Sequence, residues 1–319
     1  MKSYAIGMDI GGTNSVFGIV DREGQVVCCD SIKTQEYTLI DDYIEAVSTR
    51  VEALIEKVGG KKNIEGFGIG APNGNYYTGC IEFAPNLPWK GVVIPLCDMF
   101  EKRLGIRTRL TNDANAAALG EMTYGVAKGV KNFIMITLGT GVGSGIVVDG
   151  KMLYGSTGFA GELGHVTVNR TPQARLCGCG RRGCLETYCS ATGIARTARE
   201  RVIAMAEPSL LRELDVMKIT SKDIYDAAVK GDAMAISIFR ETGTILGRAL
   251  ADMVVFSSPE MIVLFGGLAK AGDYILKYAE EAMDENLLPI FKGTVKLVLS
   301  GLKDADAAVL GASALGWKE

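Results

Sequence analysis

The sequence predicts two α/β lobes related by an internal duplication. Residues 4–21 run from an apolar strand through a glycine turn into a second apolar strand and end on Gly-Ile-Val-Asp; residues 133–150 repeat this order and end on Gly-Ile-Val-Val-Asp-Gly. After each hairpin, strands alternate with helical stretches, which is typical of mixed α/β sheets. A chain of 319 residues also exceeds the size at which one core usually keeps growing. These observations favour two lobes with a cleft between them.

Hydrophobic periodicity predicts the remaining elements of the first half. They are a strand at 24–33, a helix at 40–58, a β-rich run at 64–70, a short helix at 95–104, a strand at 107–111 and a helix at 113–125. Asn112 and Asp113 stand where the last of these helices begins, and both residue types are favoured at a helix N-terminus.

The second half follows the same pattern with an insertion. We expect helices near 190–205, 221–230, 232–256 and 272–285, strands at 261–265 and 295–299, and a final helix whose small residues suit packing against the first lobe. The predicted lobes are residues 1–120 plus about 302–319, and residues 121–301 with a zinc-binding insertion at 165–186. The hinge is expected at element ends near 120–130.

Composition points to small-molecule partners. A net charge of −3 with 22% charged residues provides no basic surface for nucleic acid or anionic membrane. The chain enters a strand at once, which leaves no room for a signal peptide, and its apolar stretches are interrupted well short of a spanning helix. Eight cysteines are too few for a disulfide scaffold in a chain of this length. We therefore expect a cytoplasmic protein.

The single histidine lies just ahead of three clustered cysteines. The candidate metal ligands are His165, Cys177, Cys179 and Cys184. One nitrogen and three sulfurs are a set that structural zinc favours, and the glycines at 178, 180 and 183 let the chain wrap around an ion. Without the histidine, free thiols would explain the cysteines equally well. Closing this loop would bring Glu162 and Glu186 near one another.

Two glycine turns are candidates for phosphate binding. Asp9 ends a buried strand, and the following Gly11, Gly12 and Thr13 form a tight turn whose N–H groups can face an anion. The segment TLGTGVGSG, residues 137–145, has the same character. Asp9 could hold Mg²⁺ through water. Each turn alone could be a simple hairpin. A dinucleotide fingerprint is excluded because a strand follows the glycines, and no P-loop motif is present.

Asp113 is the candidate catalytic base. A carboxylate at the start of a helix is kept ionised and can accept a proton from an attacking alcohol. The alternative is that Asp113 or Asn112 only caps the helix. The single histidine is assigned to the metal, so no histidine base remains.

The motifs DIGGT, NDANAAALGE, LGTGVGSGIVVDGK, AGELGH and CGCG-x-x-GCLE occur together in this order. This combination, from residue 4 to the C-terminus, resembles the ROK family of bacterial sugar kinases and repressors, and most closely its ATP-dependent glucokinases. The resemblance implies a duplicated ribonuclease H-like fold, as in actin-like ATPases and sugar kinases. It also implies transfer of the ATP γ-phosphate to the 6-hydroxyl of a hexose, with glucose favoured.

The resemblance assigns roles by position. Asp113 is the implied base, and the sugar contacts are Asn86, Asn112, Asp113, Glu162, His165 and Glu186. The expected nucleotide contacts are Asp9, Gly11, Gly12, Thr13, Gly139, Thr140, Gly141, Gly266 and Gly267. A strand-to-helix turn explains the last glycine pair equally well. The expected cofactors are ATP, Mg²⁺ and structural Zn²⁺, and the resemblance also implies a homodimer or larger homo-oligomer.

Several alternatives remain at this point. The hexose could instead be allose, N-acetylmannosamine or fructose. A sugar-responsive repressor would need an N-terminal helix-turn-helix ahead of the first strand, where this chain has only three residues. A catalytically silent sugar-binding protein would not require Asp9, Thr13 and Asp113 together. Asn73 replaces a glycine that is usual in the family, and Asn73 and Trp89 are either sugar neighbours or turn and core residues.

Overall fold

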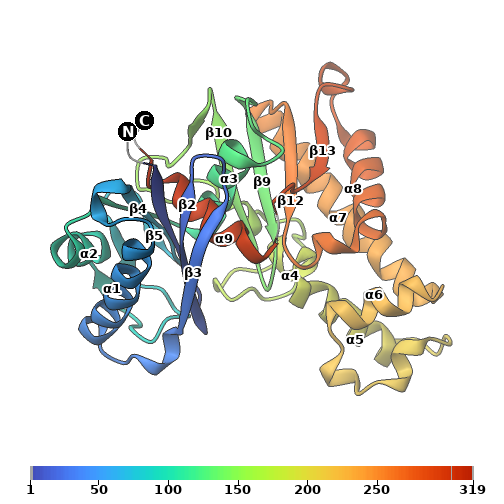
Figure 1. Ribbon diagram of the computed structural model, residues 1–319. Coiled ribbons are helices and arrows are strands. Elements are labelled where there is room, and N and C mark those ends of the chain that lie inside the picture. Colours follow the sequence, from blue (N-terminus) through green and yellow to red (C-terminus); the bar gives the residue numbers. More distant parts are fainter. Residues whose placement is uncertain (1–2, 303, 318–319) are drawn as a thin grey trace. The chain divides into compact units, whose positions relative to one another are not determined.

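The computed structural model describes residues 3–302 and 304–317. The chain forms two compact units (Figure 1). Unit 1 comprises Met1–Val130, Gly145–Gly161 and Ser300–Glu319, and unit 2 comprises Lys131–Ser144 and Glu162–Leu299. The segments 121–130 and 145–161 thus group with unit 1, whereas the sequence placed them in the second lobe. The expected lobe division stays a prediction, and its residues 1–2, 303 and 318–319 lie outside the described residues.

Unit 1 contains a mixed five-stranded sheet with the order β3-β2-β1-β4-β8. Its strands are β1 (Tyr4–Ile10), β2 (Asn14–Asp21), β3 (Val26–Lys33), β4 (Ile64–Gly70) and β8 (Thr108–Thr111). β1, β2 and β3 are antiparallel neighbours, whereas β4 lies parallel to both β1 and β8. The carboxyl ends of β1, β4 and β8 therefore share one edge of the sheet.

Helices cover both faces of this sheet (Figure 1). They are α1 (Ile40–Lys57) and α2 (Leu96–Leu104) on one face, and α3 (Asp113–Tyr124) and α9 (Asp304–Ala314) on the other. Alternate residues of the central strands form a buried core with α1 and α2. On the other face, Gly7 and Gly68 let α9 lie close, because a Cβ at either position would overlap the α9 backbone. The predicted packing of the last helix against the first half is confirmed.

A small three-stranded antiparallel sheet follows β4 and was not expected from the sequence. It has the order β5-β6-β7, with β5 (Gly74–Asn75), β6 (Cys80–Glu82) and β7 (Val93–Ile94). Strands of two or three residues show no hydrophobic period that a sequence could reveal.

The second sheet has the order β11-β10-β9-β12-β13. Its strands are β9 (Phe133–Leu138), β10 (Val142–Val148), β11 (Lys151–Met152), β12 (Met261–Phe265) and β13 (Lys296–Leu299). When the five strands of each sheet are numbered 1 to 5 along the chain, both sheets have the same order, 3-2-1-4-5. This shared order confirms the predicted duplication and the predicted α/β class with mixed sheets.

The helices of unit 2 are α4 (Glu186–Cys189), α5 (Ala191–Ala204), α6 (Ser221–Val229), α7 (Ala233–Ser257) and α8 (Asp273–Asn286). They pack with β9 and β12 around one large hydrophobic core. The strands and helices whose bounds were predicted lie within two residues of those bounds. The last helix, α9, ends at Ala314, before the end of the stretch that was expected to be helical. Helix α4 and strand β11 were not predicted.

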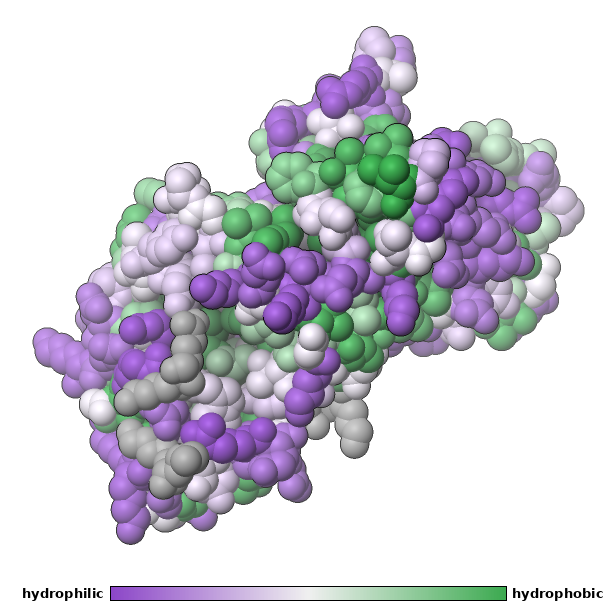
Figure 2. Space-filling view, turned by 90° about the horizontal axis from the view of Figure 1, so that it is seen from above, coloured by the Kyte–Doolittle hydropathy of each residue, from purple (hydrophilic) through white to green (hydrophobic). Residues whose placement is uncertain are grey.

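Among the described residues, no helix combines the length and apolar character needed to cross a membrane. On the face drawn in Figure 2, hydrophilic residues alternate with smaller groups of hydrophobic ones.

Candidate active site

Three adjacent strands place Asp9 and Asp113 at one edge of the first sheet. Asp9 is paired in register with Gly70, and Gly70 is paired with Thr111. Asn112 and Asp113 follow Thr111 directly. A Cβ at Gly70 would lie 3.7 Å from Asp9 Oδ1 and 3.8 Å from Asp113 Cα, so this glycine lies between the two acidic residues. The sequence did not single out Gly70, because only strand register places it there.

The surroundings of both carboxyl groups favour the protonated form. Burial raises the pKa of Asp9 to about 7, and the negative charge of Asp113 adds to the shift. Desolvation by the surrounding protein likewise raises the pKa of Asp113, although its side chain remains open to solvent. The N–H of Ala114, 2.8 Å from Asp113 Oδ1, opposes that shift. The edge of the sheet thus holds two carboxyl groups of raised basicity.

Asn112, and not Asp113, caps helix α3. Its Oδ1 accepts a hydrogen bond of 2.7 Å from the N–H of Asn115. The Asn112 side chain is buried, with its amide nitrogen still able to donate. Helix capping therefore accounts for Asn112 but leaves the Asp113 carboxylate available for other chemistry.

The first glycine turn, residues 9–13, lies against the loop that contains Asn86. The turn is closed by a hydrogen bond of 2.9 Å from the N–H of Gly11 to the carbonyl of Asn14. A Cβ at Gly12 would lie 2.9 Å from the carbonyl oxygen of Asn86. Thr13 and Asn86 are both exposed. The structure therefore brings a predicted phosphate turn and a predicted sugar contact together within unit 1.

Asn73 and Trp89 are turn and core residues, respectively. Asn73 has a φ of 53°, in the left-handed region that asparagine tolerates, and its Nδ2 donates to the carbonyl of Glu82 at 2.9 Å. Trp89 is 7% exposed, and its ring centre lies 4.6 Å from that of Tyr43. Glycine is required at the next position, because a Cβ at Gly74 would overlap the Thr111 carbonyl.

In unit 2, the two predicted glycine sites follow neighbouring parallel strands. The second glycine turn, residues 139–142, follows β9, and Gly266-Gly267 follows β12; the last residue of β12 is paired with Thr137 of β9. Gly266 has a φ of 102°, and a Cβ there would lie 2.8 Å from the Leu138 carbonyl. This close approach explains why residue 266 is a glycine. Because β9 and β12 are parallel neighbours, the residues that follow them lie at one edge of the sheet, namely Gly139, Thr140, Gly141, Gly266 and Gly267.

Two side-chain contacts connect the inserted segment, and the residues just before it, with the end of the second glycine turn and strand β10. Glu186 begins α4, and its Oε2 accepts a hydrogen bond of 3.1 Å from the N–H of Val142. A Cβ at Gly141 would overlap the same oxygen. Ser144 Oγ accepts a hydrogen bond of 3.1 Å from the N–H of Leu163, which lies between Glu162 and His165. Val142 and Ser144 were not predicted as site residues, because their partners lie 44 and 19 residues away along the chain and such contacts leave no local sequence pattern.

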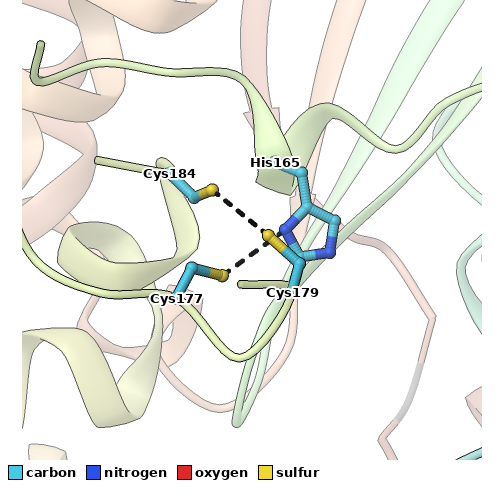
Figure 3. A group of neighbouring side chains, drawn as sticks. All are labelled: His165, Cys177, Cys179 and Cys184. Carbon is cyan, nitrogen blue, oxygen red and sulfur yellow. Dashed lines mark hydrogen bonds between the residues drawn. The ribbon is translucent and has the colours of Figure 1, made fainter. Parts of the chain in front are cut away.

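The four predicted metal ligands converge on one point (Figure 3). Their ligand atoms all lie within 4.8 Å of one another. His165 Nδ1 lies 3.7 Å from Cys177 Sγ, and Cys179 Sγ lies 3.7 Å from Cys184 Sγ. A tetrahedron with zinc–sulfur bonds of 2.3 Å has edges of about 3.8 Å, so these distances fit zinc. Cys177 Sγ also lies 3.6 Å from Glu186 Oε1.

The cysteine environments differ. The backbone N–H and the guanidinium of Arg181 lower the pKa of Cys179 to about 6. Burial raises the pKa of Cys177 to about 12 and also raises that of Cys184. Gly180 and Gly183 have φ values of 85° and 78°, the left-handed conformation that lets this loop curve around its centre.

Comparison with known proteins identifies the family. Residues 5–319 match the ROK family. The chain belongs to this family. The glucokinase of Halalkalibacterium halodurans is 38% identical over 98% of this ROK protein and 94% of the relative, and the glucokinase of Thermotoga maritima is 36% identical over 98% and 97%. A ROK family glucokinase from Streptomyces griseus, solved in complex with glucose and AMPPNP, has a TM-score of 0.79 and 34% identity over 98% of both chains.

These matches confirm the predicted ROK membership and the sugar-kinase fold. Each unit contains one set of the predicted site residues. Unit 1 holds Asp9, Gly11, Gly12, Thr13, Asn86, Asn112 and Asp113, and unit 2 holds Gly139, Thr140, Gly141, Glu162, His165, Glu186, Gly266 and Gly267 with the three cysteines.

Proposed function

We propose that this ROK protein is an ATP-dependent glucokinase, which transfers the γ-phosphoryl group of ATP to the 6-hydroxyl of glucose. The observation that supports it most is the pair Asp9 and Asp113, held at one sheet edge in a chain 36–38% identical to glucokinases over almost its whole length. A base near the acceptor hydroxyl and an anion-binding turn are the groups that phosphoryl transfer to an alcohol requires.

Asp113 is the proposed base. As the sugar oxygen attacks the γ-phosphorus, its proton passes to the Asp113 carboxylate, and the bond from the γ-phosphorus to the bridging oxygen of ADP breaks. The raised pKa of Asp113 makes its carboxylate a better proton acceptor than an ordinary aspartate. Asp9 would hold Mg²⁺ through water, and Mg²⁺ neutralises charge on the phosphates when bound. The transition state is loose, so most of the rate gain comes from positioning and electrostatics.

The proposed nucleotide contacts are the backbone groups of the two glycine turns and of Gly266-Gly267. In the first turn, Gly12 and exposed Thr13 would present backbone and hydroxyl donors beside Asp9, while the N–H of Gly11 closes the turn. In the second, Gly139, Thr140 and Gly141 follow a buried strand in the same way. Gly266 and Gly267 would lie near the adenosine.

The proposed sugar contacts are Asn86, Asn112, Asp113, Glu162, His165 and Glu186. The ring of His165 turns Nδ1 toward the cysteines and Nε2 away from them (Figure 3). Nε2 is therefore the nitrogen that would hydrogen-bond a sugar hydroxyl. The remaining carboxylate and amide groups can accept hydrogen bonds from the ring hydroxyls and thereby orient the sugar. A polar site of this kind rejects sugar analogues that leave its hydrogen-bonding groups unpaired.

His165, Cys177, Cys179 and Cys184 would hold a structural Zn²⁺. The donor set and its spacing fit a closed tetrahedral site, which supplies cross-linking and no open position for catalysis. Such a cross-link would fix the loop from residue 165 to residue 184 and thereby the positions of His165 and Glu186.

An ADP-release assay over a panel of hexoses tests the proposal. We expect the highest kcat/KM with glucose, and turnover that requires Mg²⁺. A higher kcat/KM with allose, N-acetylmannosamine or fructose would change the assigned sugar but keep the reaction. Absence of sugar-dependent ADP release with every hexose would contradict the proposed activity itself.

Homo-oligomer formation and a cytoplasmic location stay predictions. Large hydrophobic side chains are exposed at several positions, including Ile203, Met217, Phe256 and Ile290. Covering such residues would favour self-association. Sedimentation analysis at micromolar concentration measures the oligomeric state directly, and a monomer would contradict the prediction.

A further inference from the structure

We propose that Arg175 is a positioning residue of this kinase. It lies inside the metal-binding insertion without being a metal ligand, and it orients the α4–α5 segment that contacts the second glycine turn. The inference rests on the proposed function for its kinetic consequences, but its contacts can be tested without catalysis.

Both terminal nitrogens of the Arg175 guanidinium donate hydrogen bonds to other residues of unit 2. Its side chain is 9% exposed. Nη1 donates to the carbonyls of Thr187 at 2.8 Å and Gly193 at 3.2 Å, and Nη2 donates to Thr197 Oγ1 at 2.9 Å and Glu200 Oε2 at 2.6 Å. Four hydrogen bonds from one planar group require the fork geometry of arginine, which lysine lacks. The guanidinium therefore fixes α4 relative to α5.

Tyr188 adds a second attachment of Arg175 to α4. The guanidinium carbon lies 4.7 Å from the centre of the Tyr188 ring. The Tyr188 hydroxyl accepts hydrogen bonds from the Arg175 N–H at 3.2 Å and from Asn169 Nδ2 at 3.1 Å. The loop from residue 169 to residue 175 is thus attached to α4 through contacts that do not involve the metal ligands.

The α4–α5 segment in turn contacts the second glycine turn at three points. The Glu186 carboxylate accepts from Val142 N–H at 3.1 Å. The N–H of Ala191 donates to the Gly139 carbonyl at 2.8 Å, and Thr192 Oγ1 donates to the Thr140 carbonyl at 2.8 Å.

Helix α4 has only four residues, too few to be stable alone, so its position depends on neighbouring contacts. Arg175 holds the carbonyl of Thr187, the residue directly after Glu186. Losing this contact should let Glu186 move away from the second glycine turn. Sugar binding through Glu186 and nucleotide binding through the turn should both weaken.

The test compares full-length wild type with Arg175→Met and Arg175→Lys. The bound zinc per chain, the melting temperature, the glucose KM and the AMPPNP dissociation constant without sugar are measured. We expect Arg175→Met to keep its zinc and fold, to raise the glucose KM by roughly 10-fold and to weaken AMPPNP by about 3-fold. Arg175→Lys should recover only part of each effect. A matched control is Arg170→Met, which changes an exposed arginine of the same loop and should leave all four quantities unchanged.

A double-mutant cycle separates positioning from general stability. If Arg175 acts through Glu186, Arg175→Met should change AMPPNP affinity much less in a Glu186→Ala background than in wild type. Additive effects in the cycle, or wild-type KM and AMPPNP affinity in a folded Arg175→Met protein, would overturn the proposal.

Tyr188→Phe provides a milder change if Arg175→Met does not fold. It removes the hydroxyl that accepts the Arg175 N–H while keeping the ring, and it should raise the glucose KM by about 2-fold to 3-fold. An unchanged KM and AMPPNP affinity in this variant would also count against the proposal. If wild type phosphorylates no hexose, the proposed function fails, but the AMPPNP measurements still test the role of Arg175.

Discussion

The two glycine turns follow the same strand order but differ in the side chain that precedes them. Asp9 lies two residues before Gly11, and Thr137 lies two residues before Gly139. Asp9 offers a carboxylate of raised pKa, whereas Thr137 Oγ1 accepts a hydrogen bond of 3.1 Å from the N–H of Gly143 within its own hairpin. The two turns thus share a strand order, but a titratable carboxyl group precedes one and a hydroxyl bonded within its own hairpin precedes the other.

The two sheets also differ in the residues that supply further polar groups near each turn. In unit 1, β8 leads into Asp113, so a second carboxylate lies at the edge beside Asp9. In unit 2, polar groups at the corresponding edge come from the inserted segment through Glu186. We infer that unit 1 supplies proton transfer and that unit 2 supplies orientation. Five substitutions test this division.

Asp113→Asn should have the largest effect. The amide keeps the shape of the side chain but cannot accept the proton, so kcat should fall by roughly 100-fold or more with little change in the KM values for sugar and ATP. Steady-state kinetics, together with a melting curve to show that the variant is folded, measure this effect.

Glu162→Gln is the contrasting variant for Asp113→Asn. A residue that holds ring hydroxyls should raise the glucose KM strongly as well as slow transfer. If Asp113→Asn kept most of its kcat, or lost activity only by unfolding, the base would have to be another group.

Cys179→Ser should come next. We expect loss of about one zinc per chain and at least a 10-fold rise in the glucose KM, because the loop would no longer fix His165 and Glu186. Elemental analysis and glucose titration measure the two effects. Cys29→Ser, at an exposed cysteine outside the site, is the matched control. Full activity in the presence of Mg²⁺, after exhaustive chelation has removed all zinc, would contradict the structural role of zinc.

The sequence predicted the four residues of the candidate metal site better than it predicted the contacts around them. One histidine and three cysteines are rare enough to be recognised by spacing alone, and regular strands and helices were recognised by their periods. Glu186 was predicted to contact the sugar, but its hydrogen bond with Val142 was not predicted. The two residues are 44 positions apart in the sequence, so this bond depends on tertiary packing. Arg175 differs from Arg170, Arg181 and Arg182 only in what surrounds it after folding.

Asp9→Asn should have an effect of intermediate size. It should raise the stability of the protein and lower its activity. Folding raises the pKa of Asp9 from 3.8 to about 7, so the folded protein binds this proton more tightly than the unfolded chain. Its ionisation therefore costs stability as the pH rises from about 4 to 7, and the full cost remains at pH 8. Without nucleotide and Mg²⁺, Asp9→Asn should be more stable than wild type at pH 8 by on the order of 2 kcal/mol.

This difference should vanish near pH 3, below the unfolded pKa of 3.8, where wild-type Asp9 is mostly protonated in both states. Denaturant unfolding at the two pH values measures it. Activity should fall about 10-fold or more, because the variant cannot hold Mg²⁺ as a carboxylate does. A variant less stable than wild type at pH 8 would show that Asp9 is held by partners and is not strained by burial.

Thr137→Val should have the smallest effect and is the direct counterpart of Asp9→Asn. Valine keeps the branched shape but removes the oxygen that accepts the Gly143 N–H, so the hairpin should lose about 1 kcal/mol of stability. Because no charge is removed, kcat should change by no more than about 3-fold, and its pH profile should match that of wild type. A loss of activity as large as that of Asp9→Asn would show that the second turn also contributes a side chain to the chemistry. The proposed division between the two units would then be wrong.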